Sequence, residues 1–298
     1  MVLRESLDCA GFQGPGGTCA KETTLLLPGV SFGNVGQLGL DVLLTTAATA
    51  LRQKRNNVVF ERVCCLSSPH VIPVVGNNPL GQNVAESGNE SWKQGAGAST
   101  AIELFRIGNN CESAKDEEIM VLQLRSPILE GHVQFFVDEL AEWIASKGFS
   151  LVWAVAGADS GLTANPAASH GQFSHLSHDL PSIWATRVAK LGLFDAQAGS
   201  APSAETMQAP FPPASKAGIL VSLRAGCKAR NVAFLGLVRY VKEGINVHDG
   251  IAMACACNEI GRILPPATDG SANSTWTVPS FWRKLFAVDH RAPPDLLF

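Results

Sequence analysis

The sequence predicts an α/β fold: a three-layer α/β/α sandwich with a mixed, largely buried central sheet, an irregular insertion and a Pro-rich C-terminal tail. Short continuous apolar runs, such as residues 24–30 and 149–156, are typical of strands that are buried on both faces. Residues 131–147 instead place apolar side chains at helical spacing, and Gly148 follows as a helix stop signal. Because strands and helices alternate, we expect helices on both faces of one sheet.

In the first half of the chain, a glycine-containing turn over residues 31–36 follows the strand at 24–30. Apolar residues then recur at helical spacing from Val35 to Leu51, which predicts a helix directly after the turn. Four further strands are expected, separated by clusters of Pro, Gly and Asn, over residues 58–63, 71–75, 102–107 and 119–125.

In the second half, residues 159–216 are rich in Ala, Ser, Pro, His and Gly, which predicts an irregular insertion. Within it, helical periodicity is confined to residues 180–194. Residues 231–240 are apolar and fit either a strand or a helix. Residues 246–264 are predicted to form the last helix, with Asn246 as its N-cap.

The domain organisation follows from these elements. Residues 24–264 form one α/β domain, preceded by a flexible leader over 1–23 and followed by a Pro-rich tail over 265–298. With 298 residues, of which 46% are hydrophobic, the chain can bury a full core.

Composition narrows the classes of partner. The formal net charge is −3 and the isoelectric point is about 6.2, so the chain has no excess of cations to neutralise nucleic acid or an anionic membrane. The first twenty residues lack the pattern of a secretory signal, and no apolar run reaches the roughly 18 residues of a membrane span. We therefore expect a soluble intracellular protein in the cytoplasm, with the nucleus as an additional option.

The eight cysteines are expected to be reduced, structural thiols. Cys64 and Cys65 are adjacent, Cys255 and Cys257 lie in an apolar helical pattern, and no Cys-x-x-Cys pair occurs. Neither a cofactor nor a metal site is expected.

A local histidine cluster consists of His170, His175 and His178, with Asp179 beside them. Its spacing is compatible with a metal, but the surrounding Ser, Gly and Ala predict a flexible loop with solvated imidazoles. Ser160 follows a strand but lacks the Gly-x-Ser-x-Gly context of a hydrolase nucleophile.

The glycine-rich turn contains Gly33, Asn34 and Gly36. A turn of this kind before a helix exposes N–H groups that can hold a phosphate. Its spacing matches neither Gly-x-Gly-x-x-Gly nor a P-loop, which needs a Lys where this chain has Gln37. The favoured interpretation is that the glycines permit a tight turn and close packing of helix on sheet.

Two further segments are candidates for shaping loops or binding a partner. Gly76, Asn77, Asn78 and Pro79 carry no group that titrates near neutrality, and their sequence predicts a specific turn. Arg125 ends a strand and supplies a cation for a carboxylate, either of a partner or of its own fold.

Four strings, in order along the chain, are similar to the proteasome assembly chaperone 2 family. Residues 25–44 resemble its first strand, turn and helix. Residues 74–79 resemble its Val-Gly-Asn-Asn-Pro loop, 121–126 its Leu-Gln-Leu-Arg-Ser strand, and 241–250 its Glu-Gly-x-Asn stretch. The resemblance favours a strand over residues 231–240.

The resemblance implies a non-catalytic chaperone for assembly of the core proteasome. Such a subunit pairs with a proteasome assembly chaperone 1-like subunit and acts on the proteasome α-ring, where the heterodimer promotes ring formation and prevents off-pathway association. The alternative is a nucleoside- or nucleotide-binding enzyme on a related scaffold, with the turn from Gly33 to Gly36 as the anion site and Arg125 as a clamp.

The tail contains an aromatic segment with Phe281, Trp282, Leu285 and Phe286. Spacings of four would gather these side chains on one apolar face of a short helix, which should dock either on its own domain or on a partner. Some relatives end in a hydrophobic residue, a tyrosine and any residue, whereas this chain ends in Asp-Leu-Leu-Phe. Docking of the tail on the α-ring in that form is therefore not expected from this sequence.

Overall fold

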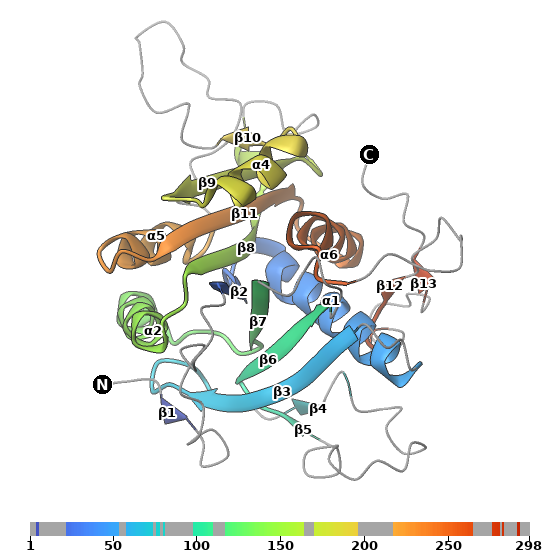
Figure 1. Ribbon diagram of the computed structural model, residues 1–298, viewed down its shortest axis with the longest axis horizontal. Coiled ribbons are helices and arrows are strands. Elements are labelled where there is room, and N and C mark those ends of the chain that lie inside the picture. Colours follow the sequence, from blue (N-terminus) through green and yellow to red (C-terminus); the bar gives the residue numbers. More distant parts are fainter. Residues whose placement is uncertain are drawn as a thin grey trace, which may run out of the picture.

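The computed structural model describes residues 4–5, 22–53, 58–73, 76–77, 80, 98–109, 117–163, 170–195, 217–264, 276–280, 282 and 291–292. In these residues, one nine-stranded sheet runs through the centre of the molecule (Figure 1). From one side to the other its strands are β1 (Arg4–Glu5), β3 (Val58–Ser67), β6 (Ile102–Asn109), β7 (Glu117–Leu124), β2 (Glu22–Pro28), β8 (Leu151–Asp159), β11 (Ala233–Val241), β9 (Phe173–His178) and β10 (Phe194–Asp195).

The middle of the sheet is parallel, its flanking strands are antiparallel, and the outermost pair β9–β10 is again parallel. β7, β2, β8 and β11 are parallel neighbours, whereas β6 pairs antiparallel with both β3 and β7, and β9 pairs antiparallel with β11. We call the side where these four parallel strands end the carboxyl edge, and the side where they begin the amino edge. β3 runs in the same direction and also ends at the carboxyl edge.

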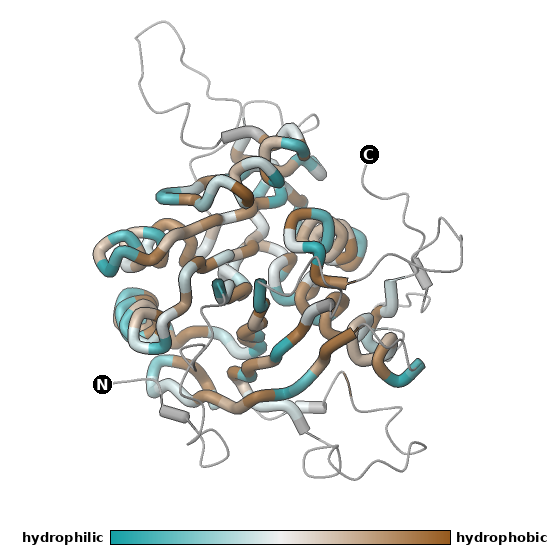
Figure 2. The backbone as a smooth tube through the Cα atoms, in the orientation of Figure 1, coloured by the Kyte–Doolittle hydropathy of each residue, from teal (hydrophilic) through white to brown (hydrophobic). Residues whose placement is uncertain are grey.

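Helices cover both faces of the sheet, which confirms the predicted three-layer α/β fold. One face carries α1 (Val35–Arg52), α6 (Val247–Gly261) and α4 (Ser182–Lys190), and the other carries α2 (Val133–Lys147) and α5 (Leu220–Lys228) (Figure 1). Successive side chains along each strand point to opposite faces of the sheet. Leu26 therefore packs into the core under α1, α4 and α6, whereas Leu25 and Leu27 pack into the core under α2 and α5. Figure 2 shows the apolar residues concentrated in the central strands and in α1 and α6.

The ambiguous segment at 231–240 forms β11, and the predicted last helix forms α6. Asn246 precedes α6, but its side chain makes no capping hydrogen bond. The strand expected over 71–75 is not present in the described part of that range. Val71 forms one isolated bridge to Ile128, and Ile72 and Pro73 lie outside any strand, since proline cannot donate to a ladder.

The insertion at 159–216 is more regular than its composition predicts. β9, β10 and α4 all lie within it, and β9 extends the central sheet beside β11. His175 and His178 are therefore strand residues and not part of a flexible loop. In the segment 173–178 the buried positions are Ser174 and Leu176, so the apolar pattern of a strand is weak, and pairing with β11 decides the strand.

Arg239 ties this part of the sheet to its neighbours. Its Nε lies 2.7 Å from Asp249 Oδ1 on α6, one of its terminal nitrogens donates to the Gly171 carbonyl at 2.8 Å, and its guanidinium stacks on Phe173. These contacts join β11, α6 and the start of β9 through one buried cation, so the insertion is anchored at its first strand.

The boundaries of the leader and the tail also shift. Arg4–Glu5 pair with Ser67 and Leu66, and Glu22 and Thr23 belong to β2, so these parts of the expected leader are strand. In the tail, β12 (Trp276–Thr277) pairs with β13 (Arg291–Ala292). Within the described part of the chain, no helix combines the length and apolar character needed to cross a membrane.

Candidate interaction surface at the carboxyl edge

The glycine turn after β2 is packed against the sheet by its backbone. Gly33 has a φ of +69°, and a Cβ there would lie 2.5 Å from Asn246 Nδ2. Gly36 opens α1, and a Cβ there would overlap the Val155 carbonyl of β8. Asn34 also has a positive φ, of 54°, which asparagine tolerates well. The turn therefore shows the close packing of helix on sheet that was favoured over phosphate binding.

Asn246 connects this turn to the loop between β11 and α6. Its Nδ2 donates to the Gly244 carbonyl at 3.2 Å and contacts the Gly33 carbonyl at 3.5 Å. Two of the strings that carry the family resemblance, residues 25–44 and 241–250, thus meet in space at the carboxyl edge.

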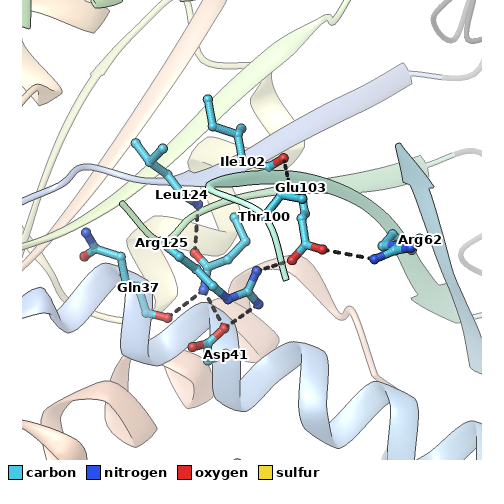
Figure 3. A network of polar contacts seen from close by, with 9 residues as sticks. Gln37, Asp41, Arg62, Thr100, Ile102, Glu103, Leu124 and Arg125 are labelled. Carbon is cyan, nitrogen blue, oxygen red and sulfur yellow. Dashed lines mark hydrogen bonds and ion pairs between the residues drawn. The ribbon is translucent and has the colours of Figure 1, made fainter. Parts of the chain in front are cut away.

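Arg125 follows β7 at the same edge and lies in a network of polar contacts (Figure 3). One terminal nitrogen lies 2.8 Å from Asp41 Oδ1 on α1, and the other forms an ion pair with Glu103 on β6. Glu103 also accepts from Arg62 of β3 at 3.2 Å. Gln123 completes the network by donating to Asp41 Oδ1 at 2.7 Å.

The cations of the network offset the cost of burying the Glu103 carboxylate. The Glu103 side chain is 1% exposed, and burial raises the pKa of this carboxyl while the cations of Arg125 and Arg62 oppose that change. Arg125 is thus engaged by two carboxylates of its own fold. These contacts argue against its role as a nucleotide clamp, because both terminal nitrogens already face carboxylates.

Exposed large apolar side chains gather at this edge. In the described residues they are Ile72, Val133, Phe135, Leu162, Ile183, Val221 and Ile245, and all except Ile183 lie in loops or first helical turns at the carboxyl edge. We call those six residues the edge surface. Isolated exposed apolar residues are ordinary, but their concentration on one side of a domain is typical of a protein–protein contact.

Leu162 and Ile245 lie in neighbouring loops of the edge surface. β8 and β11 are adjacent and parallel, with Asp159 paired to Val241, so the loops that follow them emerge side by side. Leu162 is 51% exposed and Ile245 is 66% exposed. The geometry presents two aliphatic side chains to solvent beside the tightly packed glycine turn.

The other end of the edge surface surrounds the start of α2. Phe135, 62% exposed, lies on the first turn of α2 and contacts the rings of His70 and His132. Ile72 lies in the same segment as His70, and its amide donates to the Pro127 carbonyl at 3.3 Å. This end therefore combines exposed apolar side chains with two imidazoles.

The remaining predicted site residues are placed as follows. Gly76 is exposed and, with Asn77, forms the short strand β4, which pairs with β5 (Ala98–Ser99). Asn78 and Pro79 lie outside the described residues. The described pairing of this loop is with β5.

In the aromatic segment, Trp282 is 1% exposed and belongs to the core beneath α1 and α6. Trp276 is buried in the same core, and the Thr277 amide donates to Thr46 Oγ1 of α1 at 3.0 Å. Phe281, Leu285 and Phe286 lie outside the described residues. At Trp282, the structure shows docking on the chain's own domain.

Sequence reasoning missed the edge surface. Exposure of Leu162 and Ile245 depends on loop geometry, which no periodicity reports. Phe135 offered a signal, because it lies off the apolar stripe of α2 that contains Phe136 and Leu140. The histidine cluster of the insertion, His170, His175 and His178, is a separate matter. Among the described residues, no group of three or more His, Cys, Asp or Glu is placed to hold an ion.

Comparison with known proteins identifies the class. A family model matches residues 25–273, and the chain belongs to the PAC2 family. This confirms the resemblance read from the sequence.

Relatives extend over nearly the whole chain. It is 27% identical over 285 residues to Proteasome assembly chaperone 2 of Danio rerio, covering 93% of this chain and 95% of that protein. It is 25% identical over 281 residues to Proteasome assembly chaperone 2 of Mus musculus, covering 92% and 94%. The crystal structure of Pyrococcus furiosus PbaA, described as an archaeal homolog of proteasome-assembly chaperone, aligns with a TM-score of 0.48 and 12% identity, covering 83% and 85% of the two chains.

Proposed function

We propose that this protein is a chaperone for assembly of the core proteasome, which acts as a heterodimer with a proteasome assembly chaperone 1-like subunit on the α-ring. There the pair would promote ring formation and prevent off-pathway association. The names of the relatives support the assembly role. The heterodimer, the α-ring contact and a location in the cytoplasm and the nucleus are parts of the proposal that rest on the family resemblance.

The observation that carries the proposal is the edge surface. An assembly chaperone needs a persistent shape that presents apolar side chains to another protein. The carboxyl edge has both features, because its backbone is packed on the sheet around Gly36 while Leu162 and Ile245 remain exposed.

A non-catalytic role is part of the proposal. Arg125, the cation that the nucleotide-binding alternative would use as a clamp, is engaged within the fold by Asp41 and Glu103. The glycine turn contacts Asn246 and β8 where a nucleotide enzyme would hold a phosphate. These contacts favour binding of a protein over chemistry on a small molecule.

The test is capture of proteasome α subunits by tagged protein coexpressed with a proteasome assembly chaperone 1-like subunit. The double variant Leu162→Asp/Ile245→Asp should reduce capture by about tenfold, the effect of losing one good interface contact. The matched control is Ile183→Asp, which changes an apolar side chain of similar exposure at the amino edge and should leave capture within about twofold.

Equal capture by the wild type and the double variant would show that Leu162 and Ile245 are not part of the contact. Failure of the wild-type protein to capture any α subunit would contradict the proposed function. A thermal-shift panel of nucleotides tests the enzyme alternative, since a ligand at 100 times its Kd adds about 2.7 kcal/mol of stability.

A further inference from the structure

A contact between two histidines lies within one end of the edge surface. His70 follows β3, and His132 immediately precedes α2. Their Nδ1 atoms lie 3.0 Å apart, and their ring centroids are 5.3 Å apart. That centroid separation is close to the largest that a 3.0 Å contact between Nδ1 atoms allows, so the two nitrogens point at each other. This is the geometry of an N–H···N hydrogen bond, not of two lone pairs that converge on a metal.

The contact holds a segment of the edge surface in place. The Leu129 amide donates to the His70 carbonyl at 2.8 Å, and the Ile72 amide donates to Pro127. Phe135 stacks on the His70 ring with centroids 5.8 Å apart, and its edge meets the His132 ring at 6.0 Å. The imidazole contact adds to these backbone bonds, so separation of the two rings would remove one of the contacts that hold residues 68–72 and would disturb the packing of the exposed phenyl ring.

The hydrogen bond tolerates one added proton but not two. With both rings neutral, one Nδ1–H donates to the lone pair of the other Nδ1. A first added proton goes to an Nε2 and leaves this bond intact. A second must occupy the accepting Nδ1, which places two N–H groups and two positive charges against each other. Imidazole is the side chain whose ordinary charge change falls between roughly pH 5 and 8.

Charged groups lie on the elements that flank the pair. On α2, the buried Glu139 accepts from Ser68 Oγ at 2.5 Å, and Ser68 Oγ in turn accepts from the His70 amide at 3.2 Å. Glu130, in the loop before α2, and Asp138, on α2, are exposed, and Asp138 accepts from Gln134. None of these groups can replace the lone pair of an accepting Nδ1 that has been protonated.

We propose that His70 and His132 form a proton-sensitive contact that keeps one end of the edge surface in its binding shape and is released when both imidazoles are protonated. Its consequence for partner binding rests on the proposed function, whereas the release itself is a property of this chain alone. The partner-binding shape is therefore present near neutral pH and is lost as the pH falls.

Amide hydrogen exchange tests the release without a partner. After correction for the intrinsic pH dependence of exchange, protection of the Leu129 and Ile72 amides in the wild type should fall about fivefold between roughly pH 7.5 and pH 5, as expected for loss of one hydrogen-bonded contact. In His132→Gln, which cannot form the doubly charged pair, protection should change by less than about twofold.

The matched control is His248→Gln, which removes an exposed histidine from α6 and should behave as the wild type. His70→Gln provides a second variant from the other side of the contact and should behave as His132→Gln. Unchanged protection in the wild type, or the same fall in His132→Gln as in the wild type, would overturn the proposal.

Capture of α subunits at the same two pH values separates this inference from the proposed function. If the wild type captures no α subunit at either pH, the proposed function fails, while hydrogen exchange still decides the histidine contact. If capture occurs and weakens at acidic pH in the wild type but not in His132→Gln, both are supported.

Discussion

The two edges of the sheet differ in how their connections are built. At the carboxyl edge, Gly36 approaches β8 so closely that a Cβ would overlap a carbonyl, whereas at the amino edge Gly148 ends α2 with a φ of +73° and has open space around it. The exposed apolar side chains follow the same division, with Ile183 alone at the amino edge among the described residues. At the amino edge the Gly148 connection is loosely packed, whereas the carboxyl edge combines a tightly packed backbone with an exposed apolar surface.

The difference shows how a domain can expose apolar residues without losing its shape. Three sets of contacts hold the carboxyl edge against the sheet: the backbone packing of the glycine turn, the Asn246 contact and the Arg125 network. The side chains of Leu162 and Ile245 are therefore not needed for the core and remain available to a partner. Substitutions at the carboxyl edge should consequently have different effects from matched substitutions elsewhere in the molecule.

The largest effect is expected from alanine in place of a glycine at each edge. Gly36→Ala should lower the free energy of unfolding by about 3 kcal/mol or more, because α1 must move away from the Val155 carbonyl. Gly148→Ala should cost only about 1 kcal/mol, the penalty of a left-handed conformation for a residue with a Cβ. Urea unfolding of both variants measures the difference, and equal losses would show that the two edges are packed alike.

The tail should matter for stability and not for the partner. Trp282→Ala should lower the free energy of unfolding by about 3 kcal/mol, since the side chain is 1% exposed in the core beneath α1 and α6. Capture of α subunits should persist at temperatures where the variant is folded. Loss of capture by a folded Trp282→Ala protein would mean that the partner surface extends beyond the carboxyl edge.

An arginine at each edge gives the third contrast. Arg125→Ala should cost about 3 kcal/mol, because Glu103 is 1% exposed and would keep Arg62 as its one remaining cation. Arg187→Ala should cost about 1 kcal/mol, because its partner Glu117 is 23% exposed and can turn to water. Chemical denaturation of the two variants at neutral pH measures both losses.

The pH dependence of the Arg125→Ala deficit provides the control. Burial raises the Glu103 pKa above its ordinary value of 4.5, so folding favours the neutral carboxyl. Stability from this group is fully present below the ordinary pKa and is lost as the pH rises through the raised one. Removal of Arg125 strengthens that loss, so the deficit should narrow as the pH falls toward 4.5. A deficit that is constant with pH would contradict an electrostatic origin.

The smallest effect on stability is expected at the edge surface itself. Ile245→Asp and Ile183→Asp replace exposed side chains, so each should change the free energy of unfolding by no more than about 0.5 kcal/mol. Thermal melts check this expectation. A large loss for Ile245→Asp would indicate that Ile245 supports the fold, and its effect on capture would then have a structural cause.

Sequence patterns were sufficient where local chemistry and burial agree. The apolar run of β2, the glycine turn and the stripe of α1 follow one another directly, so this unit was predicted close to its observed bounds. Residues 131–147 were predicted as a helix for the same reason, and the apolar stripe of this helix, α2, faces the core of the domain. The family resemblance is carried by short strings in order along the chain, so it too is a property of the sequence itself.

Pairing and burial decided the rest. The sequence alone determined the α/β class, the order of its main elements and the close approach required at Gly36. Only the tertiary structure showed that β9 joins the sheet and that Arg125 pairs with Asp41 and Glu103. It also showed that Trp282 is buried in the core and that Leu162 and Ile245 are exposed. The physical reason is that periodicity reports which face of an element is apolar, whereas the partner of a charge, the neighbour of a polar strand and the exposure of a loop side chain depend on residues far away in the chain.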